Sequence, residues 1–304
     1  MDTNYTRISP QELSAWMDEG RNFHLLDVLP AGVFEQRHLP GAKNACVYEV
    51  TFLEQVQTIG ISPEDVVVVY GEAEETRDAD SGAKKLLRQG FRRVYALHGG
   101  FQAWKTANSP VEGYGTEPQD HHPLPADGTY KVDLAESIIE WTGRNANGKH
   151  TGTLRLNEGI MRLDKGRVGG DFAIDISSLT NTDLEDSSLA EMLLKHLLSD
   201  DFLFAGRHPE TRFTIEQSEA LPGTTPGAIN CHLRGELLLR GRIETLAFPA
   251  TLSTIEDGMA AEAHFDLDRT RWGLLYGSGK FFKHLGMHLV HDAISIQLRI
   301  VGRK

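Results

Sequence analysis

The sequence predicts two domains of different fold class: α/β with a parallel sheet, then all-β with an antiparallel barrel. Three observations predict this. Strand-like and helix-like segments alternate over the first part of the chain, apolar and polar side chains alternate from Thr129 onward, and a stretch rich in proline, glycine and acids lies between the two. We therefore expect a first domain at residues 1–110, a linker at 111–127 and a barrel at 128–304.

Length and composition limit the class of protein. A chain of 304 residues with 40% hydrophobic and 24% charged residues suits two globular domains with packed cores. A net charge of −12 opposes binding to phosphate backbones and to anionic bilayer surfaces, so we expect neither a nucleic-acid partner nor peripheral binding to membranes. No apolar run is long enough to span a bilayer, and the first residues lack the pattern of a secretory signal. The sequence predicts a cytoplasmic location.

The elements of the first domain follow in order. Ser9 to Glu12 form a capping box with proline at the first helical position, so a helix should run to about Met17. The segment VVVVY at residues 66–70 is a continuous apolar strand, typical of a parallel sheet buried on both faces. The other expected elements are strands at 23–28 and 94–97 and helices at 31–37, 49–59, 81–88 and around Trp104.

Several short motifs of this domain resemble those of the rhodanese family over about Ile8 to Val111. They are Leu25-Leu26-Asp27-Val28, His38-Leu39-Pro40-Gly41-Ala42, Gly90-Phe91 and Leu97-His98-Gly99-Gly100-Phe101-Gln102-Ala103-Trp104.

The resemblance implies a cysteine directly after the central strand, in a loop whose N–H groups hold a thiolate or persulfide. Gly71 stands at that position, and the following loop carries acidic residues that disfavour an activated thiol. We therefore predict no catalytic residue in this degenerate loop. The acids are Glu72, Glu74, Glu75, Asp78 and Asp80.

Two residues of this domain keep alternative interpretations. Cys46 is expected as a small core residue, because cysteine is among the most buried residue types, and the alternative is a substitute nucleophile. Arg77 is expected on a solvated face, and the alternative is an anion-binding residue. Asp27 and His38 are expected to orient turns. In the linker, we expect His121 and His122 to be solvated rather than to chelate a metal.

The second domain shows ten segments with strand character, enough for a closed barrel of about eight strands. Glycines at Gly152 and Gly235 fall on the predicted inward faces, where we expect them to leave room for an elongated ligand. The ten segments are 129–133, 138–144, 150–157, 160–164, 168–176, 212–218, 229–239, 243–252, 259–268 and 293–301.

One helix interrupts these strands and leads into the most informative segment of the chain. It is expected at 189–198, begun by a capping box from Ser188 to Glu191. A polar turn then precedes Phe202 and Phe204, whose burial requires an apolar surface to cover. We therefore expect a lid-like link at the mouth of the barrel.

The same segment resembles the signature of the YceI-like family in His196-Leu197, Ser199-Asp200-Asp201-Phe202 and His208-Pro209, and the resemblance extends from Gly128 to Gly302. It implies a lipocalin-like barrel that binds a polyisoprenoid or another long-chain amphiphile and pairs as a homodimer. We expect no cofactor and no metal, although His284, His288 and His291 form a run with partly helical spacing. The candidate ligand-binding residues are Trp141, His150, His196, Phe202, Phe204, Arg271, Trp272 and Tyr276.

The sequence thus predicts a non-catalytic binding protein, whose barrel holds a long-chain amphiphile and forms a homodimer. The degenerate rhodanese domain would be a regulatory or docking module, its acidic loop facing a basic partner. The alternative is an enzyme, either a sulfurtransferase that uses Cys46 or a metal-dependent enzyme that uses barrel histidines.

Overall fold

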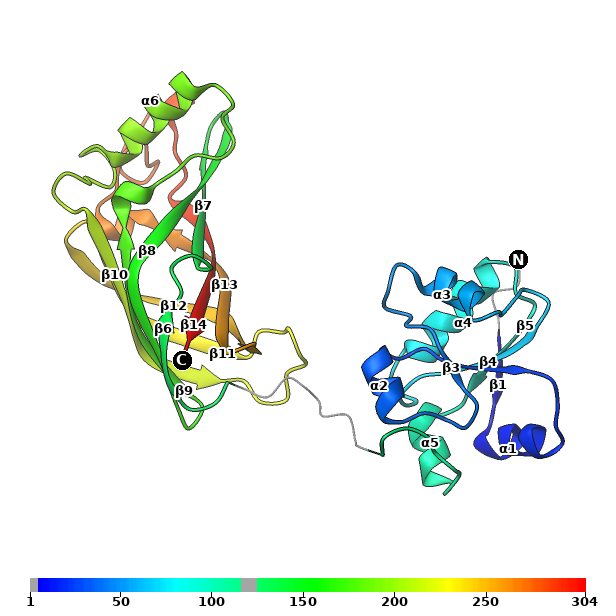
Figure 1. Cartoon of the computed structure of the whole chain (residues 1–304). Coiled ribbons are helices and arrows are strands. Elements are labelled where there is room, and N and C mark those ends of the chain that lie inside the picture. The colour runs from blue at the N-terminus through cyan, green and yellow to red at the C-terminus, as the bar shows by residue number, and fades with distance from the viewer. Residues whose placement is uncertain (1–4, 116–124) are drawn as a thin grey trace. The chain divides into compact units, whose positions relative to one another are not determined.

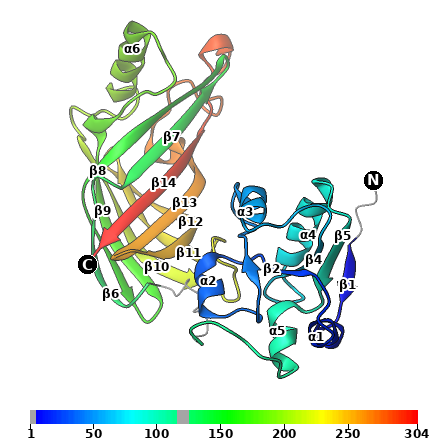
Figure 2. The same ribbon diagram turned by 45° about the vertical axis from the view of Figure 1, so that its right-hand side comes forward.

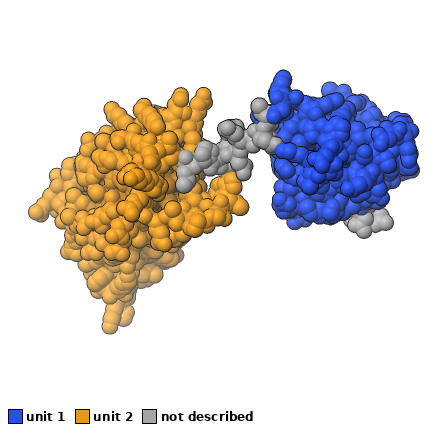
Figure 3. Space-filling model, turned by 90° about the horizontal axis from the view of Figure 1, so that it is seen from below, with its two compact units in different colours: residues 1–119 blue, residues 120–304 orange. Residues whose placement is uncertain are grey.

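The computed structural model describes residues 5–115 and 125–304, and the chain divides into two compact units, 1–119 and 120–304 (Figure 3). Each unit encloses hydrophobic clusters of its own. His121 and His122 lie outside the described residues. No helix in the described part of the chain is both long and apolar enough to cross a bilayer.

The first unit is a five-stranded parallel sheet in the order β1-β5-β4-β2-β3, flanked by helices (Figure 1). Its elements are β1 (Thr6–Ile8), α1 (Pro10–Asp18), β2 (His24–Asp27), α2 (Ala31–Gln36), β3 (Lys43–Asn44), α3 (Phe52–Thr58), β4 (Val66–Tyr70), α4 (Asp78–Arg88), β5 (Arg93–Leu97) and α5 (Gly100–Thr106).

The central strand β4 is buried on both faces, as its apolar run predicts. Val67 and Val69 pack in the cluster that includes residues of α3 and α4. Val68 and Tyr70 pack in the cluster that includes residues of α1 and α5. The alternation of side chains along one strand therefore decides which helices cover which face of the sheet.

The predicted helix starts are confirmed in part. The Ser9–Glu12 capping box is present, with Glu12 N–H donating to Ser9 Oγ at 3.2 Å and Ser9 N–H to the Glu12 carboxylate at 2.9 Å. Helix α4 begins at Asp78 rather than at residue 81, and strands β1 and β3 were not predicted. Both strands are too short to show a side-chain period, and each exists because it pairs with a longer neighbour.

The segment after α5 remains attached to the first unit. Residues His38 and Glu112 form an isolated bridge, and the N–H groups of Tyr114 and Gly115 donate to the carbonyls of Glu35 and Gln36. Residues 112–115, which the sequence places in the linker, thus pack beside α2.

The second unit is an antiparallel sheet of nine strands (Figure 1). Its elements are β6 (Gly128–Val132), β7 (Ile138–Asn145), β8 (Gly148–Asp164), β9 (Arg167–Asp175), η1 (Ile176–Ser178), α6 (Ser187–Leu198), β10 (Glu210–Ala220), β11 (Cys231–Leu239), β12 (Arg242–Ile255), β13 (Gly258–Asp268), η2 (Arg269–Trp272), η3 (Gly286–His288) and β14 (Ala293–Arg303).

This sheet closes into the predicted barrel because β13 pairs with β14. Strands β6 and β7 each pair with β8 on one side and with β14 on the other. They therefore occupy the same position in the barrel, one after the other, so the nine strands fill eight positions around it. Helix α6 and the connection between β13 and β14 lie at one end of it (Figures 1 and 2).

Two details of the predicted elements are wrong. The segments 150–157 and 160–164 belong to a single strand, β8, in which the register against β9 shifts between Leu156 and Glu158. That shift is a β-bulge, which reverses the side-chain alternation and makes one strand resemble two. The N-cap of α6 is Asp186, whose carboxylate accepts from the N–H groups of Ser188 and Leu189, so the predicted capping box at Ser188 is not the helix start.

Candidate functional site: a cavity inside the barrel

The barrel encloses a cavity of about 420 Å³. Sites for small molecules commonly have volumes of roughly 300 to 1,000 Å³ and mostly apolar walls. Apolar side chains from all strands between β7 and β14 line this cavity, so it is the hollow of the barrel itself rather than a surface dent. Representative lining residues are Ile139, Leu154, Phe172, Phe213, Leu237, Phe248, Phe265 and Ile296.

The inward faces that period two predicts are confirmed on several strands. All four alternate residues from Ala261 to Leu267 on β13 line the cavity, as do the four from Ile294 to Ile300 on β14. The pairing of Phe265 with Ile296 keeps the two faces in register. The apolar wall therefore follows directly from side-chain alternation.

The predicted role of the inward glycines is wrong. A Cβ atom on Gly152 would lie 1.8 Å from the carbonyl oxygen of Thr180, and one on Gly235 would lie 2.1 Å from that of Thr214. Both glycines therefore allow another backbone segment to approach closely. Neither lines the cavity, whereas the small side chains of Ala261 and Ala263 do.

Three aromatic rings meet at the end of the cavity that α6 covers. His196 of α6 lies edge-on to Tyr276, with ring centroids 4.6 Å apart, and to Phe202, with centroids 5.0 Å apart. Phe202 and Tyr276 are themselves 5.3 Å apart. These contacts join α6 and its following turn to the connection between β13 and β14, and all three residues line the cavity.

A second histidine of the wall is held by a carboxylate. His150 Nδ1 lies 3.0 Å from Asp183 Oδ2. Burial acts to raise the pKa of Asp183, but hydrogen bonds from the Thr151 N–H, His150 and Asn181 outweigh it and hold the pKa below its usual range. The ionised carboxylate thus orients the imidazole beside the cavity.

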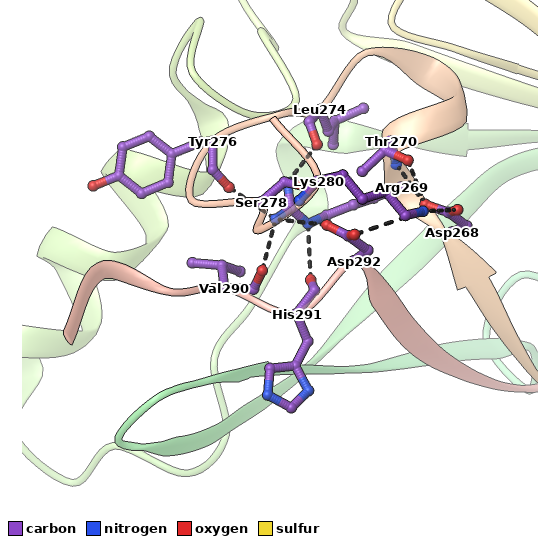
Figure 4. A network of polar contacts seen from close by, with 10 residues as sticks. All are labelled: Asp268, Arg269, Thr270, Leu274, Tyr276, Ser278, Lys280, Val290, His291 and Asp292. Atoms are coloured by element: carbon purple, nitrogen blue, oxygen red, sulfur yellow. Dashed lines mark hydrogen bonds and ion pairs between the residues drawn. The ribbon is translucent and has the colours of Figure 1, made fainter. Parts of the chain in front are cut away.

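The sequence did not predict Arg269, a buried arginine that also lines the cavity (Figure 4). Its guanidinium donates to carbonyl oxygens on both arms of the β13–β14 connection and lies 3.7 Å from Asp292. Burial lowers the pKa of Arg269, while Asp292 and Asp268 act to raise it. Periodicity cannot single out this arginine, because its partners are main-chain carbonyls. They belong to Leu274, Tyr276, Val290 and His291.

The candidate ligand-binding residues separate into two groups. Phe204 and Trp272 line a second cleft, outside the barrel cavity, together with Arg240 and Arg242. Arg271 lines neither space and forms an ion pair with Glu244 at 3.4 Å. The candidates that line the barrel cavity are Trp141, His150, His196, Phe202 and Tyr276.

In the first unit, the loop after β4 is filled by its own side chains. A Cβ atom on Gly71 would lie 2.4 Å from the Cβ of Asp78. The Asp78 carboxylate accepts from the Glu72 N–H at 3.0 Å and from Thr76 Oγ1 at 2.6 Å, and the Tyr48 hydroxyl also donates to it. The Asp78 carboxylate thus accepts hydrogen bonds from donors that an anion bound in this loop would otherwise use.

Most acids of this loop are paired within the unit. Glu72 contacts the buried Arg37 at 2.8 Å, and Glu74 contacts Arg7 at 2.5 Å. Asp80 contacts Lys84 at 2.9 Å, which leaves the loop less acidic toward solvent than the sequence indicates.

The two residues with alternative reactive roles, Arg77 and Cys46, differ in exposure. The side chain of Arg77 is 82% exposed and lies 3.5 Å from Asp80. Cys46 is buried and has a free thiol. Within residues 5–115 and 125–304, no three His, Cys, Asp or Glu side chains come together as a metal site would require.

Fold and site together define a two-domain chain with a parallel α/β unit and a hollow antiparallel barrel. A model of the YceI-like domain matches residues 130–302, and a model of the rhodanese-like domain matches residues 9–107. The chain therefore belongs to the YceI-like family and carries a rhodanese-like domain ahead of the barrel.

Individual relatives cover one domain each. Thiosulfate sulfurtransferase GlpE of Vibrio cholerae is 36% identical over 99 residues, which are 32% of this chain and 85% of that protein. The crystal structure of Burkholderia cenocepacia BcnA has a TM-score of 0.44 at 20% identity, over 56% of this chain and 98% of BcnA. A polyisoprenoid binding domain from Saccharophagus degradans has a TM-score of 0.41 at 11% identity, over 57% and 97% of the two chains.

Proposed function

We propose that the barrel is a carrier for a long-chain amphiphile of the polyisoprenoid or fatty-acyl type. The observation that carries this proposal is the cavity of about 420 Å³, with apolar walls drawn from every strand between β7 and β14. An apolar chain gains free energy on leaving water for such a wall, at about 25 cal/mol per Å² of buried surface. The polar groups of His150, His196 and Tyr276 suit the head of an amphiphile at the α6 end.

The test combines extraction of the purified protein with a cavity-filling variant. Mass spectrometry of the organic extract should find a long-chain compound, and a fluorescent fatty-acid probe should bind the emptied protein. Ala263→Phe places a ring in the cavity and should weaken probe binding at least tenfold. Ala107→Phe in the first unit is the matched control and should leave it unchanged. Probe binding that is equal in wild type and Ala263→Phe would contradict the proposal.

The rhodanese-like unit is proposed to act as a non-catalytic regulatory or docking module. Gly71 at the position where the family resemblance implies the nucleophile supports this, as does the Asp78 carboxylate beside it. The alternative enzyme, with Cys46 as nucleophile, requires a buried thiol to reach its substrate. A thiosulfate-to-cyanide assay on wild type and Cys46→Ala tests it, and turnover that Cys46→Ala abolishes would favour the enzyme.

Two further expectations stay predictions. A homodimer formed through the barrel predicts twice the chain mass of 33.7 kDa by light scattering for the full chain. The barrel without the first unit should likewise show twice its own, smaller mass. A cytoplasmic location is tested by fractionation of cells that express the full-length gene.

A further inference from the structure

The connection between β13 and β14 differs in charge from the rest of the chain. The protein carries 43 acidic residues and a net charge of −12, yet no Asp or Glu occurs from Gly273 to His291. The same stretch holds Lys280 and Lys283. It also holds three histidines, His284, His288 and His291, which are counted as neutral in that net charge. This connection therefore lacks acidic side chains in an otherwise acidic protein, and Lys283 is an exposed cation on it.

We call residues 279–288 the mouth loop, because it lies beside the opening of the cavity. Met287 and His288 line the cavity, as does Leu193 of α6. Large apolar side chains of the loop face solvent, with Phe281 55%, Phe282 47% and Met287 68% exposed. Lys283, His284 and His288 are exposed among them.

Helix α6 adds apolar side chains at the same end of the barrel (Figure 2). Leu189 is 49% and Met192 is 66% exposed. Helix and loop therefore present exposed apolar groups at the opening of an apolar cavity. Clusters of exposed apolar groups mark interaction surfaces.

The base of the mouth loop is firmly held. Lys280 Nζ lies 2.7 Å from Asp268 and 3.6 Å from Asp292. Arg269 donates to carbonyls before and after the loop, those of Tyr276 and Val290 among them (Figure 4). Because both arms are fixed, the exposure of Phe281 and Phe282 is a feature of the folded loop.

We propose that the mouth loop docks on an anionic lipid bilayer, so that the amphiphile passes between bilayer and cavity without crossing water. Phe281, Phe282 and Met287 enter the interfacial layer, and Lys283 contacts the negative headgroups. Exposed aromatic and aliphatic groups with basic neighbours are the combination that binds membrane surfaces. This proposal rests on the carrier function proposed above.

Charge favours a lipid surface over a second copy of the chain. A two-fold contact centred on the mouth loop would bring Lys283 of one copy close to Lys283 of the other. An anionic bilayer instead attracts Lys283, at about fivefold in binding constant for one lysine near the surface. The net negative charge of the whole protein acts less at contact, because the Debye length is about 8 Å at physiological ionic strength.

The experiment measures co-sedimentation of the full chain with phosphatidylcholine vesicles, with and without phosphatidylglycerol. Wild type should bind the anionic vesicles and lose binding as salt is raised. The double variant Phe281→Ser with Phe282→Ser should lose at least tenfold in binding, and Lys283→Glu at least fivefold. The matched controls are Ile229→Ser, also exposed, and Lys165→Glu, both at the far end of barrel strands. Each should change binding less than twofold.

Probe binding without vesicles separates this proposal from the carrier function. Phe281, Phe282 and Lys283 do not line the cavity, so their variants should bind a fatty-acid probe as wild type does. Ala263→Phe should bind vesicles as wild type does but should not bind the fatty-acid probe. If wild type binds anionic vesicles but not the probe, only the carrier function is overturned. The docking proposal is overturned if wild type does not bind anionic vesicles or if the mouth-loop variants and the control variants bind them equally. It is also overturned if light scattering shows a dimer that dissociates only in the mouth-loop variants.

Discussion

The guanidinium carbon of Arg269 lies 5.7 Å from the ring centre of Phe202. Arg269 directly follows β13, and Phe202 lies in the turn after α6. This cation–π contact joins the two segments that frame the cavity opening, and the main-chain bonds of Arg269 fix one of them. The opening of the barrel is therefore organised by a buried cation.

Replacing Arg269 by leucine should destabilise the barrel strongly. The change leaves four main-chain carbonyls without their side-chain donor and removes one of the two cations beside Asp292, the other being Lys280. This should cost about 3 to 5 kcal/mol of the free energy of unfolding. Lysine should restore little of it, because a single ammonium cannot reproduce the guanidinium fork. Urea unfolding followed by tryptophan fluorescence measures the loss. The control is Arg271→Leu, which removes an exposed ion pair with Glu244 and should cost less than about 1 kcal/mol. Equal losses in the two variants would contradict the stabilising role given to Arg269.

Gly152→Ala should lower the melting temperature of the barrel. Its Cβ would lie 1.8 Å from the Thr180 carbonyl oxygen, so the segment after η1 must move away from β8. Forced displacement of packed backbone costs about 1 to 3 kcal/mol. Gly169→Ala on the neighbouring strand meets no atom within 4 Å and serves as the control in calorimetry. An unchanged melting temperature in both variants would contradict the prediction, because it would mean that the segment containing Thr180 moves without loss of stability.

Gly71→Cys alone should not produce a sulfurtransferase. The new Cβ would collide with Asp78 at 2.4 Å, and the nearby carboxylate raises the pKa of a thiol and opposes an anionic sulfur donor. We expect thiosulfate-to-cyanide turnover no higher than in wild type. Adding Asp78→Ser removes both the collision and the charge. Full activity in the single variant would refute the idea that Asp78 blocks this loop.

Stability of the first unit should depend on the ionisation of Asp27. Burial raises the pKa of Asp27 from 3.8 to about 6, against the opposing effects of Tyr70 and the Leu29 N–H. The folded state therefore binds more protons than the unfolded state between about pH 4 and pH 6. The free energy of unfolding should fall by about 3 kcal/mol as pH rises through this window and level off above it.

Asp27→Asn stays neutral and keeps an oxygen for the Leu29 N–H, which donates to Asp27 Oδ1 at 2.8 Å. Urea unfolding of the full chain at pH 4.5 and pH 7.5 should show a smaller pH dependence in this variant than in wild type. The same dependence in both would mean that another group titrates.

Local patterns predicted much of the fold. The run VVVVY indicated a strand buried on both faces, and β4 packs against helices on each side. Alternation on β13 and β14 indicated the inner wall of the barrel. Each of these features depends only on the side-chain period along one segment, which is present in the sequence.

The candidate site was predicted less completely. His196, Phe202 and Tyr276 meet at the cavity opening, whereas Phe204 and Trp272 line a separate cleft. Neighbouring residues of one segment can thus face different spaces, because the turn after α6 decides where each ring points. Phe204 itself adopts a positive φ of 52° there.

The sequence by itself determined the two domains, the inward and outward faces of the strands and the glycine at the end of β4. Only the tertiary structure decided that the barrel is hollow, that Arg269 holds its opening and that Asp78 fills the loop after Gly71. The physical reason is the range of the interactions. Periodicity and capping act between residues close in sequence, whereas a cavity, a buried cation and a backbone contact such as Gly152 with Thr180 depend on segments that meet only when the chain has folded.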